Sequence, residues 1–277
     1  MVTQQTREEA AVAWWRTSII DISPGHIQVR GYPIEELIGR ISFPDMIWLM
    51  LRGGLPTPRQ SRLLEAALVA SVDHGPQAPG IAIARMAITC GIGINSAMAS
   101  GINALGDVHG GAGQQCMEFY ARIAARTESG AALQEAATAE VGQRLREGGS
   151  IPGFGHRFHP IDPRAGRLLA LVDAAAAEGA VSGRYAAIGR AVEEALAAAK
   201  RKRLPMNIDG VTAVVFSELG FPPALGRGLF VLSRSVGILA HSWEQSCQGG
   251  RIKGPMPPSI PYTYDGPPLR HFEESAG

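Results

Sequence analysis

Residues 151–164 bring together side chains that suit proton transfer and anion binding. The segment reads IPGFGHRFHPIDPR and holds two histidines and two arginines among two glycines and three prolines. Histidine transfers protons near neutral pH, and the planar guanidinium of arginine binds carboxylates and phosphates. Glycine and proline at this density exclude a regular helix or central strand, so we predict a loop that a ligand can approach closely. The alternative is a plain surface connection between two helices.

Three other short segments place polar or titratable side chains beside glycine within apolar sequence. They are Asp73-His74-Gly75, His109-Gly110-Gly111 and Asn207-Ile208-Asp209-Gly210. Each has a structural alternative, since His109 could be a core histidine and Asp209 could cap the helix that follows it. Arg234 lies inside an apolar helical pattern, where an unpaired guanidinium is unfavourable. It therefore needs either a ligand anion or a buried acid as its partner.

Helical patterns occupy most of the remaining chain and must position these segments. Apolar side chains recur at helical spacing over residues 43–52, Gly53-Gly54 ends that helix, and Thr57-Pro58 is typical of the start of the next. Residues 21–31 predict a hairpin with Pro24-Gly25 at its turn. We therefore predict an all-α fold with one weak hairpin. The predicted helices cover residues 33–37, 43–52, 58–74, 81–89, 94–105, 110–126, 131–146, 165–178, 184–200, 211–219 and 223–245.

Composition limits the classes of function. The 26 basic residues balance the 25 acidic ones, which disfavours nucleic acid as a partner. Three scattered cysteines without metal-ligand spacing indicate no metal site and a reducing compartment, so we expect a cytoplasmic protein. The first 20 residues lack the apolar core of a signal peptide, and charges and prolines interrupt the apolar run over 211–243. We therefore expect no membrane segment.

Six motifs follow one another along the chain. They are GHIQVRGYPIEEL at 25–37, DHG at 73–75, GDVHGGA at 106–112, PGFGHR at 152–157 with DPR at 162–164, NIDG at 207–210 and LSRSVG at 232–237. Taken together and in this order, they resemble the motifs of the citrate synthase family. The resemblance covers about residues 20–262, but only one helix lies between Pro56 and Asp73, where full-length citrate synthases carry several more. In that compactness, and in the segments NIDG and FVLSRSVG, the chain resembles short citryl-CoA lyases and the C-terminal citryl-CoA lyase module of ATP-citrate lyase.

This resemblance implies a citrate-synthase-like fold of two unequal helical domains. The large domain would comprise residues 1–107 and 212–277, and the smaller CoA-binding domain residues 108–211. The functional loops would then line the cleft between the domains, and closure of the small domain would exclude water. A homodimer is also implied, with the helices over 81–105 at its interface.

The resemblance further implies acid–base chemistry at the α-carbon of acetyl-CoA. Asp209 resembles the family's base at that carbon, and His109 resembles the donor to the enol oxygen. A helix beginning directly after Gly111 would keep His109 neutral. His156 resembles the acid that protonates the oxo-acid carbonyl in condensation, and in cleavage it would take the hydroxyl proton instead.

Substrate and coenzyme contacts are implied in the same way. His74 resembles the residue that orients the oxo acid, and Arg164 and Arg234 resemble the family's carboxylate ligands. No bound cofactor or metal is expected, since the coenzyme A thioester is itself a substrate. The candidate coenzyme contacts are the adenine-binding loop residues Ile151, Gly153, Phe154 and Gly155 and the phosphate partners Arg157, Lys200 and Lys202. A run of basic residues such as the one that holds these lysines is more often a solvated helix end than a phosphate site.

One departure concerns the substrate. Citrate synthases carry an arginine near the C-terminus that reaches the neighbouring subunit's site, whereas the family's Arg-Pro here reads Gly254-Pro255. Arg251 or Lys253 are candidate substitutes. We expect a citryl-CoA lyase-like enzyme that cleaves citryl-CoA, or a close 3-hydroxyacyl-CoA, to acetyl-CoA and oxaloacetate.

Two alternatives stay open. One is condensation of acetyl-CoA with oxaloacetate or another 2-oxo acid, as in citrate synthase. The other is a non-catalytic paralogue that binds CoA or dicarboxylates, which the intact set of His109, His156 and Asp209 disfavours. The direction of the reaction, the oxo acid and the source of the thioester, including a partner protein, also stay open.

Overall fold

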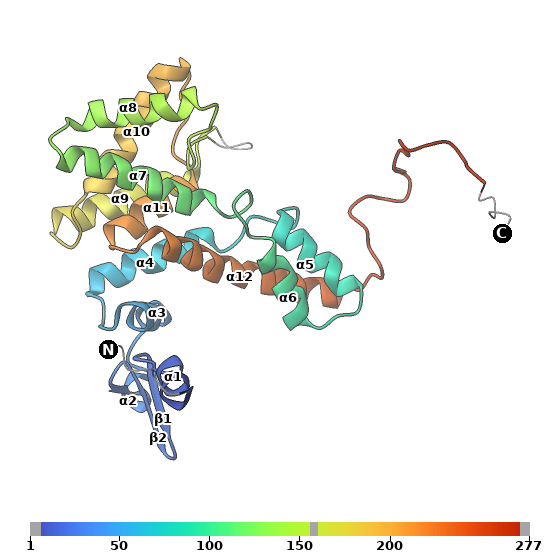
Figure 1. The fold of residues 1–277 in the computed structure, drawn as a ribbon, viewed down its shortest axis with the longest axis horizontal. Helices are drawn as coiled ribbons and strands as arrows, with labels where there is room; N and C mark the ends of the chain where they lie inside the picture. The colour runs from blue at the N-terminus through green and yellow to red at the C-terminus, as the bar shows by residue number, and fades with distance from the viewer. Residues whose placement is uncertain (1–6, 156–159, 272–277) are drawn as a thin grey trace. The chain divides into compact units, whose positions relative to one another are not determined.

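The computed structural model describes residues 7–155 and 160–271, which fold mainly into helices, whereas residues 249–271 form none (Figure 1). The all-α prediction is confirmed, and the ends of the eleven helices predicted from residue 33 onward differ from the observed ones by three residues or fewer. The helix or arm that the first residues predict over 7–20 is a helix only over Arg7–Trp14. The elements are α1 (Arg7–Trp14), β1 (Ile20–Ser23), β2 (His26–Val29), β3 (Tyr32–Pro33), α2 (Ile34–Leu37), α3 (Phe43–Arg52), α4 (Pro58–Ser71), α5 (Pro79–Thr89), α6 (Ile94–Asn103), α7 (Ala112–Glu128), α8 (Leu133–Arg146), α9 (Pro163–Ala177), α10 (Arg184–Lys200), α11 (Ile208–Glu218) and α12 (Pro223–Gln248).

Local sequence signals explain where α3 and α4 begin and end. Ser42 and Thr57 each accept a hydrogen bond from the third residue of the following helix, and that residue's side chain accepts one in return, which completes a capping box. Pro58 opens α4, where its missing N–H has no helical partner to lose. Gly53 ends α3 with a φ of 83°, a conformation that glycine adopts readily. Both predicted boundaries are confirmed.

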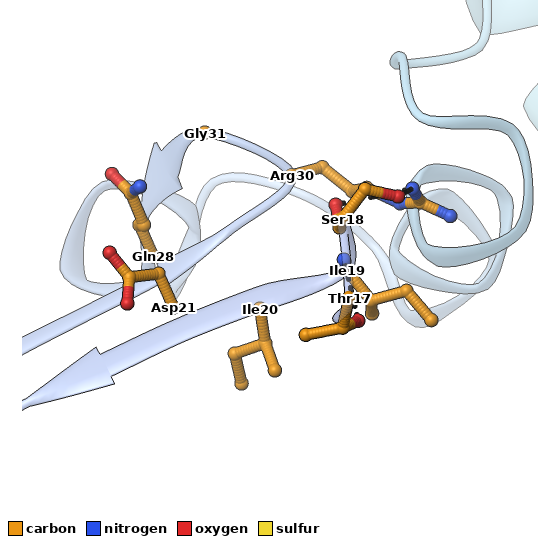
Figure 2. A pocket seen from close by; sticks show the side chains of 8 residues that line it. All are labelled: Thr17, Ser18, Ile19, Ile20, Asp21, Gln28, Arg30 and Gly31. Carbon is orange, nitrogen blue, oxygen red and sulfur yellow. Dashed lines mark hydrogen bonds between the residues drawn. The ribbon is translucent and has the colours of Figure 1, made fainter. Parts of the chain in front are cut away.

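The predicted hairpin is also present. Ser23 pairs with His26 across the Pro24-Gly25 turn, and Arg30-Gly31 forms a second tight turn into β3. The Arg30 guanidinium donates to the carbonyl oxygen of Met50 at 2.7 Å, which satisfies a carbonyl at the end of α3. Figure 2 shows the pocket beside Arg30. The volume of this pocket is about 140 Å³, which is too small for a coenzyme.

Backbone contacts divide the chain into two compact units. The first comprises Met1–His74 and Leu105–Gly237, and the second comprises Gly75–Ala104 and Ile238–Gly277. In the first unit, α11 is buried along most of its length and packs against α4, α7, α9 and α10. Residues 108–211 fall wholly within the first unit, and their separation as a smaller domain stays a prediction.

The second unit is built on the packing of α5 against α6. Gly101 lies so close to the carbonyl of Gly80 that a Cβ at that position would come within 2.6 Å of its oxygen. The side chain of Arg85 donates to Glu244 and Gln248 near the end of α12. Within the part of the chain that the structure describes, none of the helices combines the length and apolarity that a membrane span requires.

Candidate active site

Asp209 lies in the first turn of α11, and Asn207 caps that helix. The Oδ1 atom of Asn207 accepts hydrogen bonds from the backbone N–H groups of Asp209 at 2.9 Å and Gly210 at 3.2 Å. The alternative in which Asp209 itself is the N-cap is therefore wrong, because the cap lies two residues earlier. The half-buried Asp209 carboxylate is placed where the positive end of the helix dipole stabilises it.

Arg234 of α12 is almost fully buried, and its charge interacts with those of Asp209, Asp73 and Arg164. Its Nε donates to the carbonyl of Ser71 at 3.1 Å, and its guanidinium lies 4.9 Å from the centre of the Phe230 ring. Burial lowers the pKa of Arg234, and the negative charges of Asp209 and Asp73 act against that shift. Both acids therefore interact electrostatically with this guanidinium, but Asp209 is half-buried and Asp73 is exposed, so neither is a fully buried partner and a ligand anion stays a candidate.

His109 lies in the loop immediately before α7. Gly111 is the N-cap of α7, so the helix begins directly after the glycine, as predicted. Burial, together with the positive charge of Arg234, lowers the pKa of His109 below its ordinary value. At neutral pH its imidazole is therefore uncharged and has one N–H to donate.

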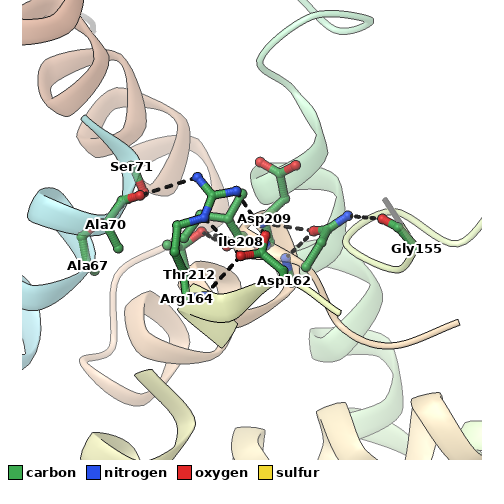
Figure 3. Close-up of polar contacts among 11 residues, drawn as sticks. Ala67, Ala70, Ser71, Gly155, Asp162, Arg164, Ile208, Asp209 and Thr212 are labelled. Carbon is green, nitrogen blue, oxygen red and sulfur yellow. Dashed lines mark hydrogen bonds and ion pairs between the residues drawn. The ribbon is translucent and has the colours of Figure 1, made fainter. Parts of the chain in front are cut away.

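Arg164 is held by a two-pronged ion pair with Asp162 at the start of α9 (Figure 3). The Nε and Nη2 atoms of Arg164 each lie 2.9 Å from a carboxylate oxygen of Asp162. Asp162 Oδ2 also accepts a hydrogen bond from the N–H of Ile208 at 2.9 Å. This buried carboxylate therefore connects the first turn of α9 to the first turn of α11. Burial alone raises the pKa of Asp162, but the hydrogen bonds and the charge of Arg164 outweigh it and lower the pKa.

We expect Asp162→Asn to lower the free energy of unfolding at neutral pH by about 2 kcal/mol. Breaking a fully buried ion pair costs about 3–5 kcal/mol, and the value here is smaller because Arg164 keeps 23% of its side chain exposed. The lowered pKa means that the stabilisation is complete above the unfolded-state pKa of about 3.9 and is lost as the pH falls through the folded-state value. Urea unfolding should show a difference between wild type and variant that shrinks in acid. Equal stability at neutral pH would contradict this role.

The candidate adenine-binding loop pairs with the segment that leads into α11. Gly155 N–H donates to the carbonyl of Pro205 at 2.8 Å, and Asn207 N–H donates to the carbonyl of Gly153 at 2.9 Å. Phe154 lies opposite Met206 between these two bonds. Ile151 and Gly153 are buried, whereas Phe154 and Gly155 are partly exposed. Those last two are therefore the residues of this loop that a ligand can reach.

Gly153 and Gly210 are in close backbone contact where the loop crosses α11. A Cβ at Gly210 would overlap the carbonyl oxygen of Gly153, and a Cβ at Gly153 would lie 2.6 Å from the Gly210 Cα. We expect Gly210→Ala to destabilise the protein by about 2 kcal/mol, as overpacking a core does. The matched control is Gly166→Ala in α9, where a new Cβ meets nothing within 4 Å and should stabilise the helix by about 0.5–1 kcal/mol. Thermal unfolding compares the two, and equal melting temperatures would contradict the close contact.

The remaining sequence-predicted residues are placed as follows. His74 is exposed and follows two residues that interact with Arg234. The Ser71 carbonyl accepts a hydrogen bond from Arg234, and the charge of Asp73 raises the pKa of that guanidinium. Lys200 and Lys202 are exposed around the C-terminal end of α10. The candidate substitutes for the missing arginine, Arg251 and Lys253, are exposed in the second unit. His156 and Arg157 lie outside the described residues.

Sequence reasoning gave no role to Asp162 or Asn207, although both lie in segments that it singled out. Their N-cap positions have a local signal, an Asp before proline and an Asn before a helical pattern. The contacts of Asp162 with Ile208 and of Asn207 with Gly155 span 46 and 52 residues and have no such signal. Among the described residues, no group of three or more histidine, cysteine, aspartate or glutamate side chains could hold a metal ion.

Comparison with known proteins gives one consistent family. A model described as "Citrate synthase, C-terminal domain" matches residues 7–62 and 56–256. The structure of citryl-CoA lyase from Hydrogenobacter thermophilus is 33% identical, with a TM-score of 0.82 over 94% of this chain and 97% of that one. ATP citrate lyase from Methanothrix soehngenii, solved with citrate and coenzyme A, is 23% identical, with a TM-score of 0.73 over 96% of this chain and 45% of that one, and shows the fold alone.

Curated relatives point the same way. Citrate synthase from Deinococcus radiodurans is 31% identical over 219 residues, which cover 77% of this chain and 54% of that protein. Glyoxysomal citrate synthase from Cucurbita maxima is 27% identical over 89% of this chain and 47% of its own length. The chain thus spans about half the length of these two relatives.

Proposed function

This chain belongs to the citrate synthase family, and we propose that it cleaves citryl-CoA, or a close 3-hydroxyacyl-CoA, to acetyl-CoA and oxaloacetate. The observation that carries the proposal is the grouping of charges around Arg234. The charges of Asp209 and Arg164 shift the pKa of this guanidinium, and the charge of the guanidinium in turn lowers the pKa of His109. A carboxylate, a neutral imidazole and two anion-binding side chains are thereby available within one compact unit.

Cleavage breaks the bond between the thioester α-carbon and the carbon that bears the hydroxyl group. The hydroxyl proton passes to a base, for which His156 is the sequence candidate, and the oxaloacetate carbonyl forms. The bonding electrons pass to the thioester, whose enolate oxygen accepts a hydrogen bond from His109. Asp209, in its protonated form, then donates a proton to the α-carbon and acetyl-CoA is released. The hydroxyl proton taken up by the base returns through solvent to the Asp209 carboxylate, so protons balance over the cycle.

The lowered pKa of His109 supports its role as a neutral donor. Neutral imidazole keeps an N–H for the enolate oxygen and does not fully protonate it. The N-terminus of α7, directly after Gly111, favours the same neutral form. These two independent features make His109 an electrophilic donor in this proposal rather than a proton carrier.

Two guanidiniums match the two free carboxylates of a citryl group whose third carboxylate is the thioester. The ion pair with Asp162 fixes the plane of Arg164, and the Ser71 carbonyl and the Phe230 ring fix that of Arg234. Planar donors held in this way select carboxylates by direction as well as by charge. His74, which follows this segment of α4, would orient the group between them.

Coenzyme A would lie along the loop that pairs with residues 205–207. In an antiparallel pair of this type, the N–H and C=O of Phe154 face away from the partner strand. They can therefore meet the donor and acceptor on the edge of adenine. Arg157, Lys200 and Lys202 would neutralise the phosphates. We further propose a cytoplasmic homodimer with α5 and α6 at its interface.

Condensation of acetyl-CoA with oxaloacetate is the second candidate. It is favoured by the surroundings of Asp209, because Arg234 and the N-terminus of α11 stabilise the carboxylate, which is the form that removes an α-proton. The same groups catalyse the carbon–carbon step in both directions, and the citrate synthase candidate differs in that water then hydrolyses the thioester of citryl-CoA to release citrate and CoA.

Purified protein supplied with citryl-CoA tests the proposal. We expect acetyl-CoA and oxaloacetate to appear in equal amounts, with the oxaloacetate detected by its enzymatic reduction. A parallel assay with acetyl-CoA and oxaloacetate measures the condensation. Release of free citrate and CoA as the main products would favour the citrate synthase variant. Binding of CoA without turnover in either assay would overturn the proposal in favour of a binding protein.

A further inference from the structure

The side chain of Asn207 spans the gap between the loop at residues 151–155 and the first turn of α11. Its Oδ1 accepts from the N–H groups of Asp209 and Gly210, and its Nδ2 donates to the carbonyl of Gly155 at 2.6 Å. Its backbone N–H donates to the carbonyl of Gly153 at 2.9 Å. One residue thus contacts the loop at two points and the helix that carries the candidate acid–base residue at two more.

The orientation of this amide is determined by its partners. The two N–H donors of α11 require the oxygen on the helix side, and the carbonyl of Gly155 requires the nitrogen on the loop side. In a flipped amide, the NH₂ group would face the two N–H groups of α11, and the oxygen would face the Gly155 carbonyl. A displacement of Gly155 would therefore weaken either the bond from the Asn207 amide to the loop or its bonds to the first turn of α11.

We propose that Asn207 is a positioning residue that couples coenzyme occupancy of the 151–155 loop to the orientation of Asp209. The inference rests on the proposed coenzyme role of that loop. When adenine holds Phe154 and Gly155, the Asn207 amide holds the first turn of α11, and the Asp209 carboxylate is fixed toward the thioester. Binding energy from the remote end of the coenzyme thereby improves the geometry at the reacting carbon.

Two substitutions separate coupling from capping. Asn207→Ser keeps a good N-cap but is too short to reach Gly155. Asn207→Asp also keeps the cap, but it turns an oxygen toward the Gly155 carbonyl and removes the donor. A residue that only caps α11 would tolerate both changes. If Asn207 couples the loop to Asp209, both substitutions should abolish that coupling. Thermal unfolding of each variant should show that it stays folded.

The experiment compares exchange of the α-protons of acetyl-CoA with that of acetylpantetheine, which lacks the adenine end. In the wild type we expect the maximal exchange rate with acetyl-CoA to exceed that with acetylpantetheine by about tenfold or more. In both Asn207 variants this ratio should fall toward one. A ratio that stays at the wild-type value in a folded variant would overturn the coupling and leave Asn207 as a cap.

A second readout is independent of turnover. Coenzyme A alone should slow hydrogen exchange of backbone amides over residues 207–211 in the wild type and not in Asn207→Ser. Equal protection in both proteins would overturn the inference. If the wild type shows this protection but exchanges no α-protons, the proposed reaction fails while the coupling stands, so the two failures are distinguishable.

Discussion

The Asp209→Asn protein should release acetyl-CoA from citryl-CoA about 10³-fold more slowly than the wild type. The amide has the shape of the carboxylate but neither donates a proton to nor removes one from the α-carbon, and positioned proton transfer contributes about 10²–10⁴-fold. The cap of α11 uses the Asn207 side chain and the backbone N–H of residue 209, so the helix keeps its start. Binding of CoA should therefore persist in this variant. Steady-state product release and CoA binding measure the two effects.

Asp173→Asn is the matched control. This aspartate forms a surface ion pair with Arg190 and is about half exposed, so the same change of one oxygen to nitrogen should leave activity unaltered. Exchange of the α-protons of acetyl-CoA should be lost in the Asp209 variant and kept in the control. If Asp209→Asn retains activity within tenfold of the wild type, another group carries out the proton transfer.

Arg234→Met should lower kcat/KM for citryl-CoA by about 10²–10³-fold. Removing one member of a buried charge pair with a ligand carboxylate costs about 2–5 kcal/mol, or about 30-fold to about 4,000-fold, and the expected loss lies in the middle of that range. Methionine keeps much of the side-chain volume beside Phe230, so the helix packing is largely retained. The charge of Arg234 also lowers the pKa of His109, and its removal should therefore raise that pKa while the effect of burial remains.

The pH dependence separates this effect from simple misfolding. Activity requires neutral His109 and is lost as the pH falls through its pKa. The acid limb of the pH–rate profile should consequently move to higher pH in Arg234→Met. Arg190→Met on the surface of α10 removes an equal charge and should move neither the rate nor the profile. An acid limb at the wild-type position would show that Arg234 does not act on the titrating group.

The fold was predictable wherever a short stretch of sequence decides the structure. The capping boxes at Ser42 and Thr57 and the turn at Pro24-Gly25 depend on side chains within three residues of the backbone they bind. Helical periodicity likewise predicts α10 without error at either end. Local chemistry was sufficient for all of these.

The site was predictable only in part. The motifs singled out Asp209, His109 and Arg234, but the common electrostatic environment of these residues depends on how α4, α11 and α12 pack, and no local pattern encodes that. The hydrogen bond from Ile208 to Asp162 could not be predicted for the same reason, because the two residues lie 46 positions apart in the sequence. The burial of Ile151 was not predicted, because a loop rich in glycine and proline is typical of the protein surface. Ile151, the first residue of that loop, packs in the hydrophobic core.

A crystal structure of the Asp209→Asn protein with citryl-CoA bound tests the central claim most directly. The account predicts the α-carbon of the thioester within about 3.5 Å of the side chain at position 209. It also predicts the thioester oxygen within about 3 Å of a ring nitrogen of His109, and a carboxylate on Arg234. A citryl group bound elsewhere, with the side chains at 109 and 209 not in contact with it, would contradict the account.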